Sequence, residues 1–197
     1  MAMDKQQVAK DIIQAALPLA AFDGWNQATL NKAAASIGYK STDVIRVFPG
    51  GAVDAVLHHL KLCDAGMVQA LAGYNLDTMK VRERIALCVR LRIMQYAPQR
   101  EAARRALLLL ANPLNAHHGL CALYQTVDEI WHAIGDSSTD FNFYTKRLTL
   151  AGVYSATLLH WLDDNSPDFE SSWSFLDRRI ENIMQFEKLK RRVREMF

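Results

Sequence analysis

Apolar residues recur every three or four positions along most of this chain, and that spacing restricts the fold more than any other feature. One such stripe comprises Val53, Val56, Leu57, Leu60, Cys63, Met67 and Leu71, and another comprises Leu120, Leu123, Tyr124, Val127, Ile130, Trp131 and Ile134. These intervals place apolar side chains on one face of an α-helix, whereas strands need alternation, which is nearly absent. The sequence therefore predicts an all-α protein.

Glycine and polar caps mark the ends of the first two expected helices. The first should run from about Asp4 to Asp23 and stop at Gly24, because glycine tolerates the backbone that ends a helix. Asn26 can cap the second, which closes on Gly38.

A short third helix follows, with Ser41 or Thr42 as its cap and its end before Pro49. Helices joined by a glycine turn form a helix-turn-helix pattern. We therefore divide the chain into an N-terminal three-helix segment, residues 1–50, and a helical body, residues 51–197.

Two later stretches carry further signals. Residues 148–162 are apolar almost all round, which is typical of a central or interface helix. Ser166 and Pro167 suit the cap and first position of the last helix. Between helices, Gly135 should end one helix and the polar run 136–140 should supply the turn and cap of the next.

Composition excludes several classes of protein. Half of the 197 residues are hydrophobic, 22% are charged and the formal net charge is +2, which suits a globular chain without wholesale attraction to nucleic acid. Three widely spaced cysteines form no disulfide framework or zinc motif, so we expect a reducing compartment. No signal peptide or membrane span is evident, so a cytosolic or membrane-peripheral protein is expected.

Catalytic and metal-binding patterns are not found in the sequence. A helical di-iron site needs two Glu-x-x-His pairs, and Glu129 with His132 supplies one. No nucleophile elbow or phosphate loop occurs, and the cysteines lie in apolar stripes, where buried thiols are expected. We therefore predict a protein that is not an enzyme and that holds no metal or cofactor.

The N-terminal segment resembles the TetR family of repressors. The positions that carry the resemblance are Ile12, Ala15, Ala16, Gly24, Leu30, Ala33, Gly38, Phe48 and Pro49. They belong to the scaffold, whereas DNA recognition needs basic and hydrogen-bonding residues on the third helix. That helix offers Asp43, which repels phosphate, and Lys40 and Arg46 supply its positive charge. We therefore expect no nucleic-acid binding, although a lipid-sensing regulator that binds DNA remains the alternative.

Two features admit both a structural and a functional reading. The helices beyond residue 100 provide more apolar faces than a simple helical sheath needs, which fits an ordinary core, a homodimer interface or a pocket for a long apolar ligand. The basic, apolar C-terminus fits contact with an anionic membrane through Lys188, Lys190, Arg191, Arg192 and Phe197, or a solvated helix end.

Residues 127–183 resemble the signature region of the Coq-nine family, accessory lipid-binding proteins of ubiquinone biosynthesis. The matching residues are Asp128, Trp131, His132, Gly135, Asp136, Ser138, Thr139, Asp140, Phe141, Asn142, Tyr144, Thr145, Arg147, Ser166, Pro167, Asp168, Phe169, Glu170, Trp173, Phe175, Leu176 and Arg179. The upstream match is looser, so the resemblance covers nearly the whole chain and is strongest over its last third.

The resemblance implies a TetR-like, all-helical homodimer that binds isoprenoid lipid, lies on the membrane surface and presents quinone precursors to a di-iron hydroxylase. It places that protein in the cytoplasm at the inner membrane of a bacterium, or on the matrix side of the mitochondrial inner membrane. By motif, the residues that dock the hydroxylase are Asp128, Ile130, Trp131, Asp140, Phe143, Tyr144 and Arg147. We expect the pocket to be lined by Leu120, Leu123, Val127, Leu150, Val153, Tyr154 and Leu158.

This sequence departs from the family pattern at three points. The family has Trp where Phe143 stands, and phenylalanine keeps the aromatic face but loses the indole N–H. Lys146 replaces arginine. The family also ends in a further membrane-binding helix, whereas this sequence stops at Phe197, so it is either a truncated chain or one that makes membrane contact through a shorter element.

Overall fold

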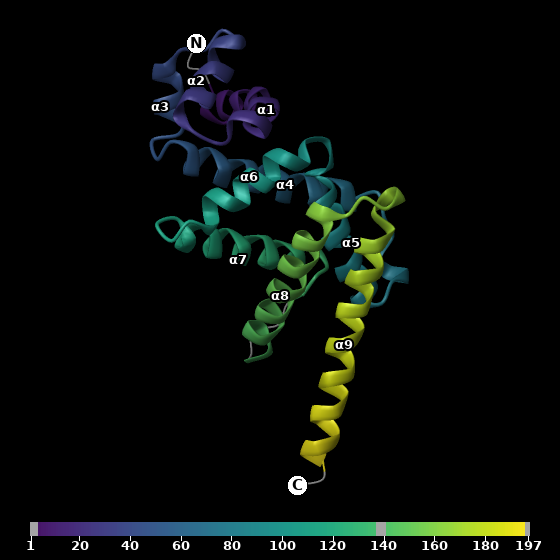
Figure 1. Cartoon of the computed structure of the whole chain (residues 1–197). Helices are drawn as coiled ribbons and strands as arrows, with labels where there is room; N and C mark the ends of the chain where they lie inside the picture. The colour runs from purple at the N-terminus through teal and green to yellow at the C-terminus, as the bar shows by residue number, and fades with distance from the viewer. Residues whose placement is uncertain (1–3, 137–140, 196–197) are drawn as a thin grey trace. The chain divides into compact units, whose positions relative to one another are not determined.

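A computed structural model describes residues 4–136 and 141–195, and side chains within them except those of 141, 142, 184 and 186–195. Every regular element in these ranges is helical (Figure 1). The α-helices are α1 (Lys5–Asp23), α2 (Gln27–Ser36), α3 (Ser41–Val47), α4 (Ala52–Leu71), α5 (Val81–Met94), α6 (Arg100–Ala111), α7 (Ala116–Ala133), α8 (Phe141–Asp163) and α9 (Glu170–Glu195). Three short 3₁₀ turns join them: η1 (Leu76–Thr78), η2 (Ala97–Gln99) and η3 (Pro167–Phe169).

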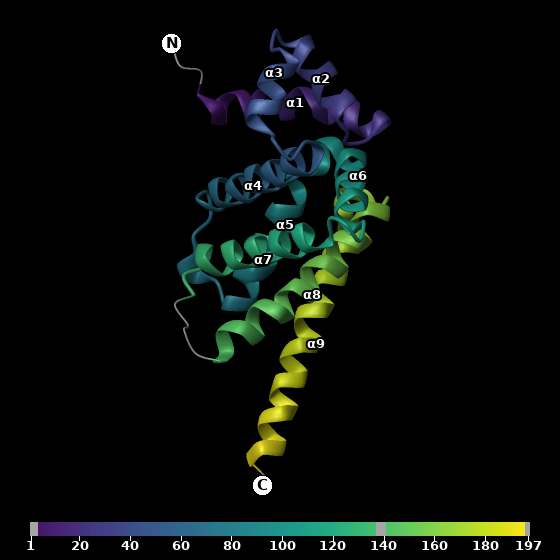
Figure 2. The same cartoon turned by 90° about the vertical axis from the view of Figure 1, so that its left-hand side faces the viewer.

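The chain forms two compact units, which differ from the division at residue 50. One unit contains Met1–Gln69 and Met94–Thr126, and the other contains Ala70–Ile93 and Val127–Phe197. Helices α1–α3 share the first unit with α6 because α1 packs against α6 as well as against α2 and α3. Figures 1 and 2 both show α2 and α3 gathered beside α1.

The caps of the first helices follow the sequence prediction, with one exception. Asn26 accepts a hydrogen bond from the backbone of Thr29 at 2.9 Å, and Gly24 ends α1 with a φ of 75°. Lys40, rather than Ser41 or Thr42, precedes α3, and its backbone N–H donates to Asp43 at 3.0 Å. Asp43 therefore stabilises the start of α3 instead of facing solvent freely.

The cysteine prediction was correct for two of three residues. Cys63 and Cys88 are buried, and burial raises the pKa of the Cys88 thiol to about 11. Cys121 is exposed, as are its stripe neighbours Leu120 and Tyr124, so this part of α7 is not covered as the apolar pattern predicts.

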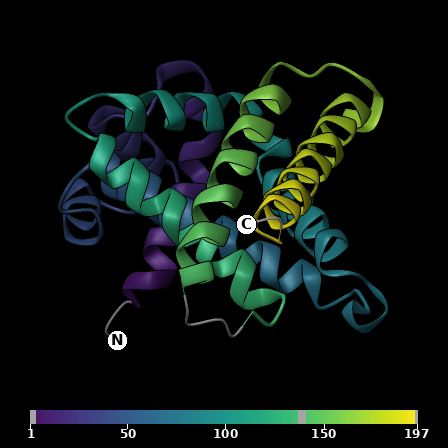
Figure 3. The ribbon, with the colours of Figure 1, turned by 90° about the horizontal axis from the view of Figure 1, so that it is seen from below.

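The second unit is built around α8 and α9, which lie side by side in Figure 3. The turn between them depends on Asp164, a buried carboxylate that was not singled out in the sequence. One oxygen accepts from the Ser166 backbone and hydroxyl at 2.8 and 2.7 Å, and the other from the Ser172 backbone and hydroxyl at 2.9 and 2.5 Å.

The start of α9 also differs from the prediction. Pro167 begins a 3₁₀ turn in which Asp168 and Phe169 take left-handed φ angles of 49° and 58°, so α9 begins at Glu170. The Ser166 hydroxyl accepts from the Ser171 backbone at 3.0 Å. Because left-handed residues other than glycine cost roughly 1–2 kcal/mol each, the bonds to Asp164 hold this turn in place.

Replacement of Asp164 should therefore destabilise the α8–α9 hairpin. Burial by itself raises the pKa of Asp164, but hydrogen bonds from Ser172 and Ser166 outweigh it and hold the pKa well below the usual range. A lowered pKa contributes stability above the unfolded value near pH 4, and this contribution is lost as the pH falls further. We expect Asp164→Ala to lower the free energy of unfolding at pH 7 by about 1–2 kcal/mol.

Urea unfolding between pH 2 and 7, followed by circular dichroism, measures this effect. Asp164→Ala should also flatten the fall in stability below about pH 4. Asp168→Asn, which removes an exposed carboxylate charge in the same turn and keeps a residue type that tolerates the left-handed φ, is the matched control for lost charge. Equal pH dependence in wild type and Asp164→Ala would contradict the assignment.

Candidate docking surface and ligand cavity

Helix α7 ends in a glycine turn that orients the residues after it. Gly135 has a φ of 83°, its N–H donates to the His132 carbonyl at 2.9 Å, and the Asp136 N–H donates to the Trp131 carbonyl at 3.0 Å. These two bonds form the Schellman motif. The sequence prediction of a stop at Gly135 is confirmed, while residues 137–140, expected to cap α8, lie outside the described residues.

A buried ion pair joins α7 to α8. The Arg147 side chain is 2% exposed, and its Nε lies 2.5 Å from Oδ1 of Asp128. Its Nη1 lies 3.7 Å from Oδ2 of Asp136, so two carboxylates face one guanidinium. His132 Nδ1 lies 3.3 Å from the other oxygen of Asp128. A buried arginine needs such partners because an unpaired buried charge is strongly destabilising.

The same guanidinium supports the aromatic pair that follows. Its carbon lies 3.4 Å from the centre of the Phe143 ring, and Nη1 donates to the Phe143 carbonyl at 3.4 Å. Phe143 is half-buried and meets Tyr144 edge to face, with ring centres 5.2 Å apart. Tyr144 is 69% exposed. We call Phe143 and Tyr144 the docking surface.

Lys146 forms a second bridge between α7 and α8. Its Nζ lies 2.9 Å from Oδ1 of Asp136 and 5.3 Å from the centre of the Trp131 ring. The Trp131 side chain is buried, at 7% exposure. Together, Asp128, Asp136, Lys146 and Arg147 form what we call the polar cluster, and its two cations are matched by two carboxylates.

A cavity of about 380 Å³ lies behind this cluster, between α5, α7, α8 and α9. Its walls are mostly aliphatic, and it is lined by Val81, Arg82, Ile85, Trp131, Thr145, Lys146, Thr149, Leu150, Val153, Ile180 and Ile183. The volume falls in the range of small-molecule pockets. Aliphatic walls with a few polar groups suit part of an apolar ligand.

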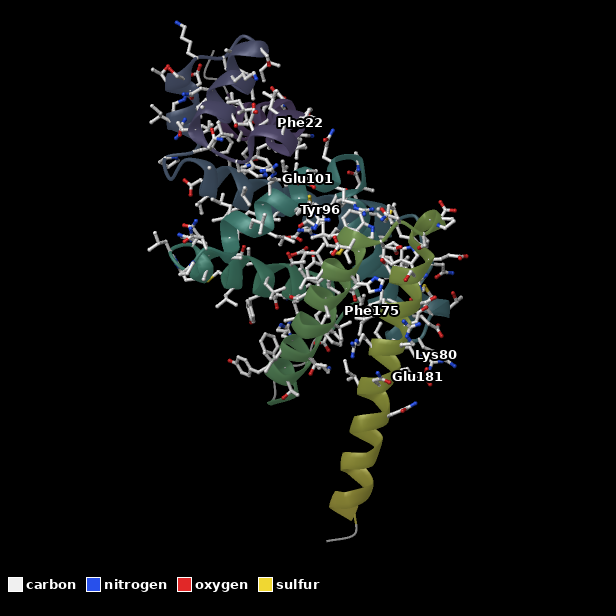
Figure 4. All side chains as sticks on the ribbon, viewed as in Figure 1. Phe22, Lys80, Tyr96, Glu101, Phe175 and Glu181 are labelled. Atoms are coloured by element: carbon white, nitrogen blue, oxygen red, sulfur yellow. The ribbon has the colours of Figure 1, made fainter. Side chains whose placement is uncertain are left out.

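A larger hollow of about 590 Å³ on α5 and α9 has different chemistry. Its wall contains an ion pair, in which Nη2 of Arg90 lies 2.7 Å from Oδ2 of Asp177. The other charged residues of the wall are Arg82, Glu83 and Glu181. Figure 4 labels Glu181 on α9. These charged walls are unsuited to a hydrocarbon, so the smaller cavity is the better ligand site.

The structure brings most of the predicted docking residues together on α7 and α8, but they differ in how deeply they are buried. Tyr144 is exposed and Phe143 half-exposed, whereas Trp131 and Arg147 are buried beneath them. Ile130 is fully buried, so its side chain supports the surface rather than belonging to it. Asp140 lies outside the described residues.

The predicted pocket residues divide into three groups. Leu150 and Val153 line the cavity. Val127, Tyr154 and Leu158 are buried in the second unit but are not part of the cavity wall. Leu120 and Leu123 belong to the first unit, and Leu120 is 67% exposed, which differs from the expected buried liner.

The cavity also contains residues that the sequence did not identify as ligand-binding. Ile85, Ile180 and Ile183 come from α5 and α9. Ile180 and Ile183 lie on the apolar stripe of the last helix, which signals burial but not what the stripe faces. Tertiary packing is what brings α5 and α9 to the same cavity.

The predicted membrane contacts fall where side chains are not described. The backbone of α9 continues through Lys188, Lys190, Arg191 and Arg192 to Glu195, and Phe197 lies outside the described residues. No described helix is both long enough and apolar enough to span a membrane. Within the same described part, no three His, Cys, Asp or Glu side chains are grouped closely enough to hold a metal ion.

The helical arrangement defines a TetR-like fold. The chain matches the structure of a TetR transcriptional regulator from Nitrosomonas europaea with a TM-score of 0.71, over 89% of this chain and 97% of that chain, at 18% sequence identity. At this identity the match shows the fold alone, and it confirms the predicted TetR-like, all-α class.

The particular family follows from the sequence that carries the site. Residues 116–187 match the family model described as COQ9. Over 197 residues the chain is 32% identical to the rat "Ubiquinone biosynthesis protein COQ9, mitochondrial", with 96% of this chain and 63% of the rat protein covered. It is 33% identical to the Xenopus tropicalis protein of the same name, covering 91% and 59%.

A more distant relative, "Probable ubiquinone biosynthesis protein coq9, mitochondrial" of Dictyostelium discoideum, is 28% identical over 87% of this chain and 58% of its own length. The resemblance to the COQ9 family is therefore confirmed. The chain spans less than two thirds of the length of these curated relatives.

The Asp128–Arg147 pair can be tested by a double-mutant cycle. Asp128→Asn and Arg147→Met should each lower the free energy of unfolding by about 2–3 kcal/mol, below the cost of breaking a fully buried pair, because Asp128 keeps 29% of its side chain exposed. The double variant should lose less than the sum of the two, because the partners are in contact.

Denaturant unfolding of the four proteins measures this coupling. Arg46→Met is the matched control, since Arg46 pairs with Asp43 at 3.3 Å on the surface and its loss should cost less than about 1 kcal/mol. Strict additivity in the cycle would show that Asp128 and Arg147 do not stabilise one another.

Proposed function

We propose that this chain is a non-enzymatic accessory protein of ubiquinone biosynthesis, which binds an isoprenoid quinone precursor and presents it to a di-iron hydroxylase at the membrane surface. The observation that carries the proposal is that one helix, α8, supplies both the docking surface and a wall of the aliphatic cavity. The names of the relatives support the pathway, and they describe those relatives as mitochondrial. We propose a place at the inner membrane, on the matrix side in a mitochondrion or on the cytoplasmic side in a bacterium.

The cavity gives the proposal its physical basis. An isoprenoid tail is costly to expose to water, at about 0.8 kcal/mol per CH₂, so aliphatic walls that cover part of it lower the cost of lifting a precursor from the membrane. Leu150, Val153 and Ile180 offer such walls. The hydroxylase would supply the metal and the chemistry, and this chain would supply extraction and orientation.

The docking surface has the residue types that anchor protein interfaces. Tyrosine and other large aromatics contribute a large share of binding energy when a partner covers them. Tyr144 projects into solvent, and Arg147 fixes Phe143 beside it from below. This support keeps the aromatic pair ordered before the partner arrives, which reduces the entropy that binding must lose.

Homodimer formation is part of the same proposal. Leu148 and Leu159, on α8, are 78% and 62% exposed, and Gly152 between them has open space where a side chain would stand. One face of α8 is therefore left uncovered within its own unit. An apolar helix with an uncovered face is what the sequence predicts for an interface helix.

The alternative is a lipid-sensing regulator that binds DNA, and α3 argues against it. Arg46 is paired with Asp43 at 3.3 Å, and Ile45 is 62% exposed on the same helix. A recognition helix needs free cations and hydrogen-bonding groups for phosphates and bases. Duplex binding that is specific and falls steeply with salt would favour the regulator.

The docking surface can be tested with the purified quinone hydroxylase of the same organism. Tyr144→Ala and Phe143→Ala should each weaken binding at least about tenfold, because each removes an aromatic anchor. Phe22→Ala is the matched control, since Phe22 on α1 is 83% exposed and labelled in Figure 4. Surface plasmon resonance measures the dissociation constants, and unchanged affinity in both variants would sink the docking assignment.

The ligand cavity can be tested by filling it. Thr149→Trp places a large ring at a half-buried wall position and should abolish co-purification of isoprenoid lipid, detected by native mass spectrometry. Leu108→Trp adds the same ring to an exposed position of α6, away from the cavity, and should leave lipid binding intact. Equal lipid occupancy in the two variants would place the ligand elsewhere.

A further inference from the structure

Helices α6 and α7 meet at a corner that exposes four large apolar side chains (Figure 1). Leu108 on α6 is 65% exposed, Leu114 in the connecting turn is 84% exposed, and Leu120 and Tyr124 on α7 are 67% and 46% exposed. A single exposed leucine is ordinary, but several large apolar side chains on one feature mark a binding surface. We call these four side chains the apolar corner.

The corner is held in shape by contacts between its two helices. Nδ2 of Asn115 donates to the Leu109 carbonyl at 3.0 Å. A Cβ added at Gly119 would lie 3.3 Å from Cβ of Leu110, so glycine allows α7 to approach the end of α6 closely. These contacts fix the turn that projects Leu114 into solvent, and the apex therefore needs little ordering when it binds.

The charges beside the corner have an excess of one sign. None of residues 102–127 is Asp or Glu. Helix α6 carries three arginines and one glutamate, a sum of +2. That glutamate, Glu101, is shared, since its carboxylate oxygens lie 3.2 Å from Nε of Arg104 and 3.4 Å from Nε of Arg105. The surface next to the apolar corner is therefore positive.

The arginines stand behind the apolar apex at a defined spacing. Arg104 and Leu108 are four residues apart, so they lie on the same face of α6. Arg105 precedes the last residue of the helix, Ala111, by about 9 Å along the helix axis. Amphipathic elements at a membrane bury their apolar side chains about 5–10 Å deep. An apex at that depth would place the arginines at the level of the lipid phosphates.

We infer that the apolar corner enters the surface of an anionic lipid bilayer, with its leucines among the acyl chains and with Arg104 and Arg105 at the phosphates. This inference rests on the proposed place at the membrane and names a surface that makes the contact. It concerns α6 and α7, and it is independent of the basic end of α9.

Other occupants fit the chemistry less well. A symmetric dimer through this corner would bring the arginines of one copy toward those of the other, and like charges repel. A nucleic acid would attract the arginines but leave the leucines in water. An anionic bilayer accepts both the apolar and the positive groups.

Vesicle flotation tests the contribution of the leucines. Vesicles of phosphatidylcholine with phosphatidylglycerol contain no isoprenoid, so the measurement does not depend on a ligand in the cavity. The double variant Leu108→Ser/Leu114→Ser should partition onto them at least about tenfold more weakly than wild type, because two buried apolar side chains are lost. Phe22→Ser, at an exposed position of α1 in the same unit, is the matched control and should float like wild type.

The same assay tests the arginines. Arg104→Gln/Arg105→Gln should weaken partitioning at least about fivefold on these anionic vesicles. It should have little effect on vesicles of phosphatidylcholine alone, which carry no net charge. Circular dichroism melting verifies that each variant folds.

A fluorescent label reports insertion directly. Cys63 and Cys88 are buried, so in a Cys121→Ser background a thiol-reactive nitrobenzoxadiazole label attaches to an introduced cysteine. At Leu114→Cys, its emission should shift to the blue on anionic vesicles and be quenched by nitroxide-bearing lipid. At Phe22→Cys, in the same background, the label should remain in water.

The outcomes separate this inference from the function on which it rests. If wild type floats but the double leucine variant floats equally well, or the label at position 114 stays in water, the inference is overturned and the proposed place at the membrane stands. If the double leucine variant loses hydroxylase binding while its flotation is unchanged, the corner is a protein interface and the inference is again overturned. If wild type floats with neither kind of vesicle, the proposed place at the membrane fails, and the inference fails with it.

Discussion

The buried guanidinium of Arg147 is the interaction on which the functional part of this structure depends. It joins α7 to α8 through Asp128 and Asp136, and it carries the Phe143 ring on its face. An arginine that is only 2% exposed would strongly destabilise the fold if its charge had no partner. The two carboxylates are therefore necessary for Arg147 to be buried. Its fork of donors and planar face allow it to pair with carboxylates and stack on a ring together, which lysine could not do.

This arrangement links two features for which we propose different functions. Outward from the polar cluster lies the proposed docking surface, and behind the cluster lies the cavity, whose wall includes Lys146 of the cluster and the Trp131 ring that Lys146 faces. The glycine turn at Gly135 sets this geometry because it brings Asp136 back toward α8. The aliphatic walls of the cavity suit an apolar chain, and the exposed aromatic pair has the residue types found at protein interfaces.

The hairpin of α8 and α9 uses a comparable device at its other end. Asp164 is buried and satisfied by four hydrogen bonds from two serines, which hold a turn that includes two left-handed residues. His160 on α8 stacks against Phe175 on α9, with ring centres 4.7 Å apart. Polar groups at the turn thus fix α8 and α9 relative to each other, and the aliphatic side chains of both helices line the cavity.

Sequence alone determined the helices, their caps at Asn26, Gly24 and Gly135, and the family resemblance of residues 127–183, because these depend on neighbours within a few positions. It also identified Phe143, Tyr144 and Arg147 as a group that capping does not explain. It could not decide depth: Ile130 and Arg147 proved buried, Leu120 proved exposed, and Ile85 and Ile180 joined the cavity from distant helices. A stripe of apolar residues states that a helix face is covered, but only the packing of other helices decides what covers it.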